Sequence, residues 1–217
     1  MSAATRRFYG RWTRAYDLLA TRAPWVGAVR ERAADALALD PGDAVLDLGC
    51  GTGAAFPALR EGVGPDGLVV GVDLTGPMLA RARDRAARWD NVHVVRGDAA
   101  RAPVVPVGAF DAVHAAFLTG LLDDPAGAVA DWLDLLAPGG RLVLVDGTPN
   151  PDAGPLSRGL FRALVWAGAP GKFRREESAA RALGRRVDAA HGALAARAAT
   201  EESRALRGFL RVTAGRP

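Results

Sequence analysis

A short apolar segment that runs directly into glycines constrains the fold of this 217-residue chain more than any other feature. Residues 45–53 read VLDLGCGTG, with Gly49, Gly51 and Gly53 at alternate positions. Glycines at the junction of a strand and a helix let a ligand approach the backbone closely, as in nucleotide-binding α/β folds. The segment therefore predicts the first strand of a parallel sheet, with a ligand site at its carboxyl end.

Apolar segments of strand length alternate with amphipathic segments of helix length along the first two thirds of the chain. Residues 75–89 and 126–136 carry large apolar side chains at helical spacing, and two more helices, over about 5–20 and 24–39, precede the first strand. This alternation predicts an α/β, Rossmann-like, doubly wound sheet that is mostly parallel, with helices on both faces. The five expected strands are residues 44–48, 68–74, 92–96, 110–117 and 141–146.

The pattern changes after residue 146, where the turn-forming run GTPNPD begins. Residues 156–166 then form one apolar stripe with arginines on its other side. We expect a charged helix over 174–186. Two short strands, 193–200 and 208–214, are expected to add an antiparallel C-terminal hairpin to the edge of the sheet.

Cysteine content limits the chemistry that is available. Cys50 is the only cysteine, so no disulfide forms within the chain and a zinc site built from paired cysteines is excluded; we expect no metal. A single thiol is typical of a reducing compartment. No apolar run reaches the roughly 18 residues of a transmembrane helix, and the arginine-containing segment 1–16 lacks the apolar run of a secretory signal. We therefore expect a cytoplasmic protein.

Charge is unevenly distributed along the chain. Residues 1–40 carry 7 basic and 4 acidic side chains, residues 41–150 carry 8 and 14, and residues 151–217 carry 13 and 6. An acidic centre suits a cationic ligand, and basic arms suit an anionic partner or substrate. Alternatively, arginine, which supplies 27 of the 28 basic residues, is simply the solvated surface residue of this protein.

Three aspartates narrow the class of ligand. Asp73 ends the second expected strand 20 residues after Gly53, where a carboxylate can accept hydrogen bonds from both hydroxyls of a ribose. Asp98 follows the third strand, where it can accept from an adenine amino group beside the backbone of Ala99. Asp47 precedes the glycines and would repel a pyrophosphate but suit an ammonium and a sulfonium, which disfavours a nicotinamide oxidoreductase. As an alternative, Asp73 and Asp98 are helix N-caps.

From about residue 8 to residue 147 the chain resembles the class I S-adenosylmethionine-dependent methyltransferases, through DLGCGTG, GVDLTGPML, RGDAA, FDAVHAAF and LLAPGGRLVLVD in that order. It is most similar to the ubiquinone and menaquinone C-methyltransferases and the bacterial phospholipid N-methyltransferases (methyltransferase type 11), which also begin with a segment like FYGRWTRAYD. The resemblance implies S-adenosylmethionine as cofactor and S-adenosylhomocysteine as product. We expect a single methyltransferase domain over 1–217, comprising a helical arm (1–40), a cofactor-binding core (41–147), a helical substrate lid (148–192) and a hairpin (193–217).

By this resemblance the three glycines face the methionine part of the cofactor, Asp73 the ribose and Asp98 the adenine, while Tyr16 closes over it. Leu74 and Met78 would supply an apolar floor. The expected cofactor-binding residues are Tyr16, Asp47, Gly49, Gly51, Gly53, Asp73, Leu74, Met78, Asp98 and Ala99.

The acceptor is less constrained, because residues 148–192 match no pattern of the family. Methyl transfer is an in-line displacement in which positioning supplies much of the catalysis and a base is optional. The candidates for a base are His114, Asp146 and His191, although His114, inside a strand, also fits a core histidine.

A small, apolar or lipid-like acceptor is expected. The fourth strand ends in AAFL, where DNA amino-methyltransferases resemble one another in a (D/N)PP(Y/F) motif, so DNA is excluded, and no recognisable RNA-binding motif is present. The stripe at 156–166 would be a lid over the acceptor, a contact to an anionic membrane surface, or a helix packed on the sheet. As an alternative function, the protein binds S-adenosylmethionine as a sensor or catalyses a step without methyl transfer.

Overall fold

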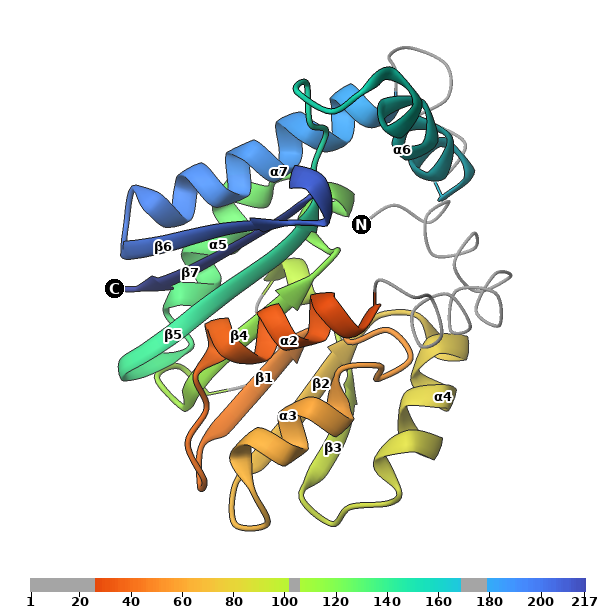
Figure 1. Ribbon diagram of the computed structural model, residues 1–217. Helices are drawn as coiled ribbons and strands as arrows, with labels where there is room; N and C mark the ends of the chain where they lie inside the picture. The colour runs from red at the N-terminus through yellow and green to blue at the C-terminus, as the bar shows by residue number, and fades with distance from the viewer. Residues whose placement is uncertain (1–25, 102–105, 169–178) are drawn as a thin grey trace.

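The computed structural model describes residues 26–101, 106–168 and 179–217, which surround one seven-stranded sheet (Figure 1). The strand order is β3-β2-β1-β4-β5-β7-β6. Strands β1 to β5 are parallel, and β7 lies antiparallel between β5 and β6. The predicted mostly parallel sheet with an antiparallel C-terminal hairpin is therefore confirmed. The strands are β1 (Ala44–Leu48), β2 (Leu68–Asp73), β3 (Val92–Arg96), β4 (Phe110–Ala116), β5 (Leu136–Gly147), β6 (Ala199–Ala205) and β7 (Leu210–Arg216).

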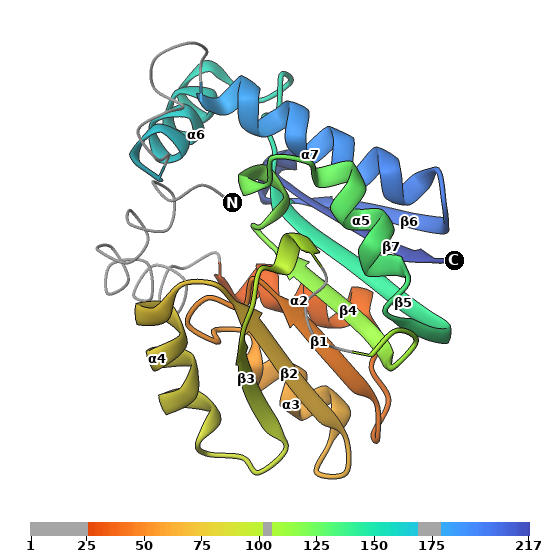
Figure 2. The ribbon, with the colours of Figure 1, turned by 180° about the vertical axis from the view of Figure 1, so that it is seen from behind.

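Helices cover both faces of the sheet (Figures 1 and 2). Helices α2, α3 and α4 share a buried apolar cluster on one face, and α5 and α7 share a second cluster on the other. Helix α6 lies beyond the carboxyl end of β5 and packs against α7. None of the described helices is long and apolar enough to cross a bilayer. Their bounds are α2 (Val26–Leu37), α3 (Phe56–Val63), α4 (Gly76–Ala86), α5 (Pro125–Leu133), α6 (Pro155–Gly168) and α7 (Ala179–Ala195).

Strand β1 shows why the sheet is covered on both sides. Val45 belongs to the cluster that contains Phe56 of α3, whereas Leu48 belongs to the cluster that contains Trp132 of α5. Parallel strands with helices on both faces are apolar at nearly every position, since neither side faces water. Asp47, in the middle of this strand, is therefore a costly residue that needs a compensating partner.

Several element boundaries differ from the predicted ones, and two of the differences have a clear cause. The helix expected over 126–136 ends at Leu133, and β5 begins at Leu136, before the glycines that were expected to precede the strand. The reason is that Leu136 pairs with Phe110 ahead of an irregularity in the ladder. The strand expected from residue 193 begins at Ala199, because the alanine-rich chain continues as helix α7 through Ala195. The helix expected over 5–20 lies outside the described residues.

Candidate functional site

The glycine loop after β1 has a backbone that favours glycine. Gly49, Gly51 and Gly53 have φ angles of 68°, 56° and 72°, in the left-handed region that side chains disfavour. The N–H groups of Gly49 and Cys50 both donate to the carbonyl of Val72, at 2.8 and 3.0 Å. These bonds tie the loop to the end of β2 and leave a tight turn that carries few side chains.

Asp73 joins this loop directly. Its carboxylate accepts a hydrogen bond from the Gly51 N–H at 3.1 Å and another from the Thr75 N–H at 2.7 Å. Burial raises the pKa of Asp73, and the N–H groups of Thr75 and Gly51 oppose that rise. Thr75, rather than Asp73, occupies the N-cap position of α4. The carboxylate is thus positioned against the glycines by two backbone donors.

Asp98 follows β3 and leads into the short 3₁₀ helix η1 (Ala99–Arg101). Its Oδ1 accepts from the Ala100 N–H at 3.1 Å, so the N-cap interpretation describes part of its role. Trp132, fully buried in α5, donates its Nε1–H to the Ala99 carbonyl at 2.7 Å and holds this turn in place.

The three aspartates lie on neighbouring strands at one edge of the sheet. Asp47 pairs in register with Gly71 of β2, and Asp73 pairs with Arg96 of β3, two residues before Asp98. Of the remaining predicted contacts, Met78 is buried in α4 and Leu74 is half-buried after β2, whereas Tyr16 lies outside the described residues. The carboxylates therefore converge on the edge that the glycine loop occupies.

Asp47 forms a buried pair with His114 that sequence reasoning missed. Asp47 Oδ1 lies 2.9 Å from His114 Nδ1, and both residues are 3% exposed. Asp47 Oδ2 and His114 Nε2 are also buried, and within the described part of the chain neither has a hydrogen-bond partner. A buried carboxylate oxygen without a donor is rare in folded proteins and marks a place where a ligand can donate. No local signal in the sequence indicated this pair, because it forms only where β1 lies beside β4.

The thiol of Cys50 has low reactivity. Burial raises its pKa well above the usual value, and the negative charges of Asp47 and Asp73 raise it further. A thiol that stays protonated is a poor nucleophile. Cys50 therefore acts as a small packing residue inside an acidic environment.

Asp146 and His191, two of the candidate bases, are buried in the core. Asp146 Oδ2 accepts from the Thr119 hydroxyl at 2.7 Å and lies 3.3 Å from His191 Nε2, while His191 Nδ1 lies 2.7 Å from the Thr213 hydroxyl. His191 has no exposed surface, because α7 turns it toward the sheet instead of presenting it after the helix as the sequence suggested. Burial raises the pKa of Asp146, and hydrogen bonds from His191 and Thr119 oppose that rise.

Two features near the ends of β4 and β5 were not found by sequence reasoning. Phe117, directly after β4, has a φ of 54° and a side chain that is 38% exposed, an unusual conformation for a bulky residue.

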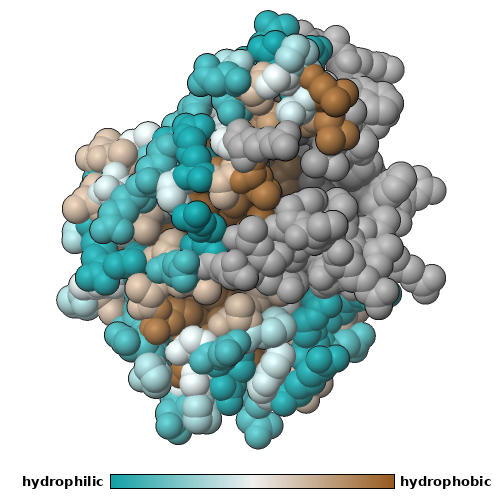
Figure 3. All heavy atoms as spheres, in the orientation of Figure 1, coloured by the Kyte–Doolittle hydropathy of each residue, from teal (hydrophilic) through white to brown (hydrophobic). Residues whose placement is uncertain are grey.

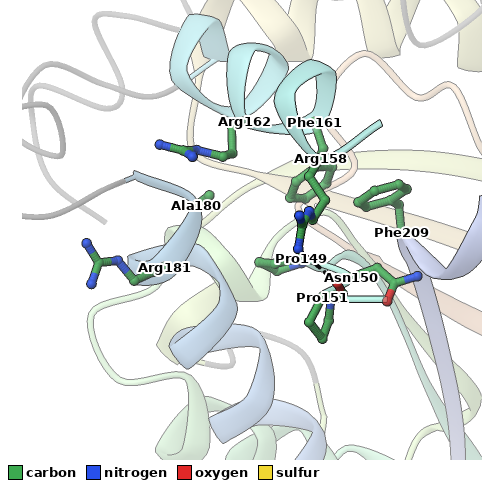
Figure 4. A pocket seen from close by; sticks show the side chains of 9 residues that line it. All are labelled: Pro149, Asn150, Pro151, Arg158, Phe161, Arg162, Ala180, Arg181 and Phe209. Atoms are coloured by element: carbon green, nitrogen blue, oxygen red, sulfur yellow. Dashed lines mark hydrogen bonds between the residues drawn. The ribbon is translucent and has the colours of Figure 1, made fainter. Parts of the chain in front are cut away.

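A cavity of about 420 Å³ follows β5, between the loop at Pro149–Pro151, α6 and the start of α7 (Figure 4). Phe161 and Phe209 stack at its wall with ring centroids 5.0 Å apart. Its parts lie some 60 residues apart in sequence, so no local signal existed.

The residues at the β1–β2–β3 edge fit S-adenosylmethionine. Its ammonium and sulfonium suit an acidic site with an unpartnered buried carboxylate oxygen, and its bulk suits a loop whose glycines carry no Cβ. No group of three or more His, Cys, Asp or Glu side chains among residues 26–101, 106–168 and 179–217 could hold a metal ion.

Comparisons with known proteins agree with this geometry. Residues 45–140 match the methyltransferase domain family. Nocamycin O-methyltransferase from Saccharothrix syringae is 38% identical over 159 residues, which are 71% of this chain and 56% of that protein. Demethylmenaquinone methyltransferase from Thermus thermophilus is 44% identical over 124 residues, 56% of this chain and 55% of that protein. The chain thus spans about half the length of these relatives.

A solved structure shows the same fold. The S-adenosylmethionine-dependent methyltransferase from Aquifex aeolicus superimposes with a TM-score of 0.66 at 19% identity, over 95% of this chain and 97% of that one. The strand order, the glycine loop and the matched domain lead to one assignment. Residues 45–140 belong to the methyltransferase domain family, and the described residues have the fold of a solved S-adenosylmethionine-dependent methyltransferase.

Proposed function

We propose that the chain transfers the methyl group of S-adenosylmethionine to a small, apolar or lipid-like acceptor. The observation that carries this proposal is the Asp73 carboxylate, bonded to the Gly51 N–H at 3.1 Å beside the buried, unpartnered Oδ2 of Asp47. Together they place two carboxylates beside a turn with left-handed glycines. Such an acidic site favours a cationic nucleoside over a nucleotide phosphate.

We assign each cofactor-binding residue one part of the ligand. Gly49, Gly51 and Gly53 lie along the methionine moiety, and Asp47 is closest to its positive charges. Asp73 accepts from the ribose hydroxyls. The adenine amino group donates to Asp98 while the Ala99 backbone faces a ring nitrogen, with Leu74 and Met78 beneath the ring and Tyr16 above it.

The chain catalyses the reaction by positioning. The bound cofactor supplies an activated methyl carbon, and holding an acceptor atom about 3 Å away in line with the breaking bond lowers the barrier by several kcal/mol. The three candidate bases are 0–3% exposed, with His114 held by Asp47 and Asp146 held by Thr119 and His191. We therefore propose that these three residues stabilise the strands that carry the site and do not act as bases. Any proton lost by the acceptor passes to water.

An apolar acceptor is supported by the relatives and by the cavity. One relative is named for demethylmenaquinone and another for nocamycin, both organic small molecules. The cavity beside β5 is walled by Phe161, Phe209, Pro149 and Pro151, which suits the body of such a molecule. Its volume of about 420 Å³ is in the range of small-molecule sites.

Calorimetric titration with S-adenosylhomocysteine tests the cofactor site. We expect micromolar affinity in the wild-type chain and a loss of at least about tenfold in Asp73→Ala, because a carboxylate–hydroxyl pair is a charge-assisted interaction. Asp66→Ala, which removes an exposed carboxylate in the turn before β2, should bind as the wild type does. Undetectable binding, or full affinity in Asp73→Ala, would reject the site.

Transfer itself needs a separate measurement. Incubation with methyl-labelled S-adenosylmethionine and a panel of quinols, phenols and amines should give a labelled organic product. If the chain binds S-adenosylhomocysteine but labels no small molecule, the sensor alternative replaces the proposed transfer.

We also propose that α6 makes a peripheral contact with an anionic bilayer. Leu156 and Leu160, one turn apart, are 88% and 72% exposed, with Arg158 and Arg162 beside them, and apolar surface is visible over α6 in Figure 3. An apolar ridge flanked by arginines is typical of interfacial helices. The wild type should co-sediment with phosphatidylglycerol vesicles, and Leu156→Gln/Leu160→Gln should not. Val107→Gln, which changes another exposed apolar residue, should co-sediment as the wild type does. Equal sedimentation of all three would exclude this contact.

A further inference from the structure

Three arginines line the cavity beside β5, in addition to its apolar residues. Arg158 and Arg162, one turn apart on α6, and Arg181, in the first turn of α7, all line it. No carboxylate is among the nine described residues that line the cavity. An apolar substrate alone gives no reason for three guanidinium groups at one small cavity.

The arginines are arranged around the stacked rings. Arg158 donates from Nη1 to the Pro151 carbonyl at 3.0 Å, which holds its stem across the cavity (Figure 4). The side chains of Arg162 and Arg181 project to the same side from their two helices, away from the stacked rings of Phe161 and Phe209 (Figure 4). The site therefore has an aromatic end and a cationic end.

Close packing between backbone segments builds the walls of this cavity. A Cβ added to Gly147, the last residue of β5, would lie 3.7 Å from the Phe161 ring, so α6 sits over the end of that strand. A Cβ on Gly184 of α7 would lie 3.3 Å from Pro149, and one on Gly208 would lie 2.6 Å from the Asn150 side chain. The loop is thus enclosed on three sides.

The strand order sets on which side of the sheet the cavity lies. The glycine loop follows β1, the cavity follows β5, and only β4 lies between these strands. Both therefore lie beyond the carboxyl ends of the parallel strands, the side on which α/β folds bind their ligands.

We propose that this cavity binds an anionic group, a phosphate or a carboxylate, of the acceptor. This inference rests on the proposed methyl transfer and narrows the acceptor to an amphipathic anion. Arg162 and Arg181 bind the anion, Arg158 shapes the cavity floor, and the stacked rings contact the apolar body. Arginine suits this role because its planar guanidinium pairs with two oxygens at once.

Binding of 1-naphthyl phosphate, compared with uncharged 1-naphthol, tests the proposal. Calorimetry is carried out with and without saturating S-adenosylhomocysteine. We expect the phosphate to bind at least about tenfold more tightly than the naphthol, with an affinity that falls as salt increases. Arg162→Glu/Arg181→Glu should weaken the phosphate at least about 20-fold and leave naphthol and S-adenosylhomocysteine affinities unchanged. Arg216→Glu is the control: it reverses a charge at the end of β7 far from the cavity. This variant should bind naphthyl phosphate with the affinity of the wild type.

Equal affinity for the phosphate and the naphthol would overturn the proposal, as would full phosphate affinity in the double variant. Phosphatidylglycerol vesicles distinguish the two sources of the anion. If vesicles bind through these arginines but naphthyl phosphate does not bind, the arginines recognise lipid headgroups on a membrane surface. The assignment of the cavity as an anion site is then wrong. If the chain fails to bind S-adenosylhomocysteine, the proposed methyl transfer is rejected instead. The preference for naphthyl phosphate over naphthol, measured in the absence of S-adenosylhomocysteine, would still test the anion site in the cavity.

Discussion

Replacement of Gly53 by alanine tests whether the glycine loop is held by the core beneath it. Gly53 has a φ of 72°, and an added Cβ would lie 2.5 Å from Cε2 and 2.6 Å from Cδ2 of Phe56. The Phe56 ring has no exposed surface, so it cannot move away without displacing the cluster around it. Gly53→Ala should therefore distort the loop, the core, or both.

Gly139 provides the matched control, because its φ is 81° and no heavy atom lies within 4 Å of an added Cβ. An L-residue in the left-handed region costs about 1 kcal/mol, which both variants lose. The overpacking against Phe56 adds about 1–3 kcal/mol for Gly53→Ala only. At about 3 °C per kcal/mol for a chain of this size, we expect Tm to fall by about 3 °C in Gly139→Ala and by about 9 °C in Gly53→Ala.

Thermal denaturation and S-adenosylhomocysteine titration measure the two consequences. Affinity should fall at least about tenfold in Gly53→Ala, since the loop must shift, and remain unchanged in Gly139→Ala, at the amino end of β5. Gly53→Ala should cost less stability in a Phe56→Leu background than in the wild type, because the smaller side chain removes the contact. Equal Tm losses for the two glycines, or the same cost of Gly53→Ala in both backgrounds, would refute the argument.

Two further variants test the buried polar network around Asp146 and the turn at Ala99. Because burial raises the pKa of Asp146, folding favours its protonated form; this stabilisation is full below the usual pKa of 3.8 and lost as pH rises through the folded-state value. Wild type should therefore lose stability relative to Asp146→Asn as pH rises above 3.8 in urea titrations, and a pH-independent difference would count against this. Trp132→Phe removes the donor to the Ala99 carbonyl and leaves a small cavity, so it should lower the free energy of unfolding by about 2–4 kcal/mol and weaken S-adenosylhomocysteine binding. A loss below about 1 kcal/mol in the same titration would show that this hydrogen bond contributes little.

The glycine loop and β1 were predictable because their chemistry is local. Strand bounds of residues 44–48 agree with the predicted ones, and three glycines at alternate positions have the positive φ angles that only glycine adopts easily. The order of strands and helices likewise follows from period-2 and period-3.6 patterns within each segment. The acidic residues at the ends of β2 and β3 could be located because parallel strands end at one edge.

The partners of buried polar groups were not predictable. Asp47 meets His114, 67 positions away, only because β1 lies beside β4, and Asp146 meets His191 only because α7 turns one particular side toward the sheet. Strand adjacency and helix rotation arise from packing over the whole core, which no single segment encodes.

Local patterns therefore sufficed for the order of the elements and the glycine turn, because a residue's backbone preference and the alternation of apolar side chains act within a few positions. Tertiary packing decided which polar groups are satisfied, why the three candidate bases are withdrawn from solvent, and where three arginines gather beside stacked rings. Those features depend on contacts between residues tens of positions apart, and only the assembled sheet brings such residues within a few ångströms of each other.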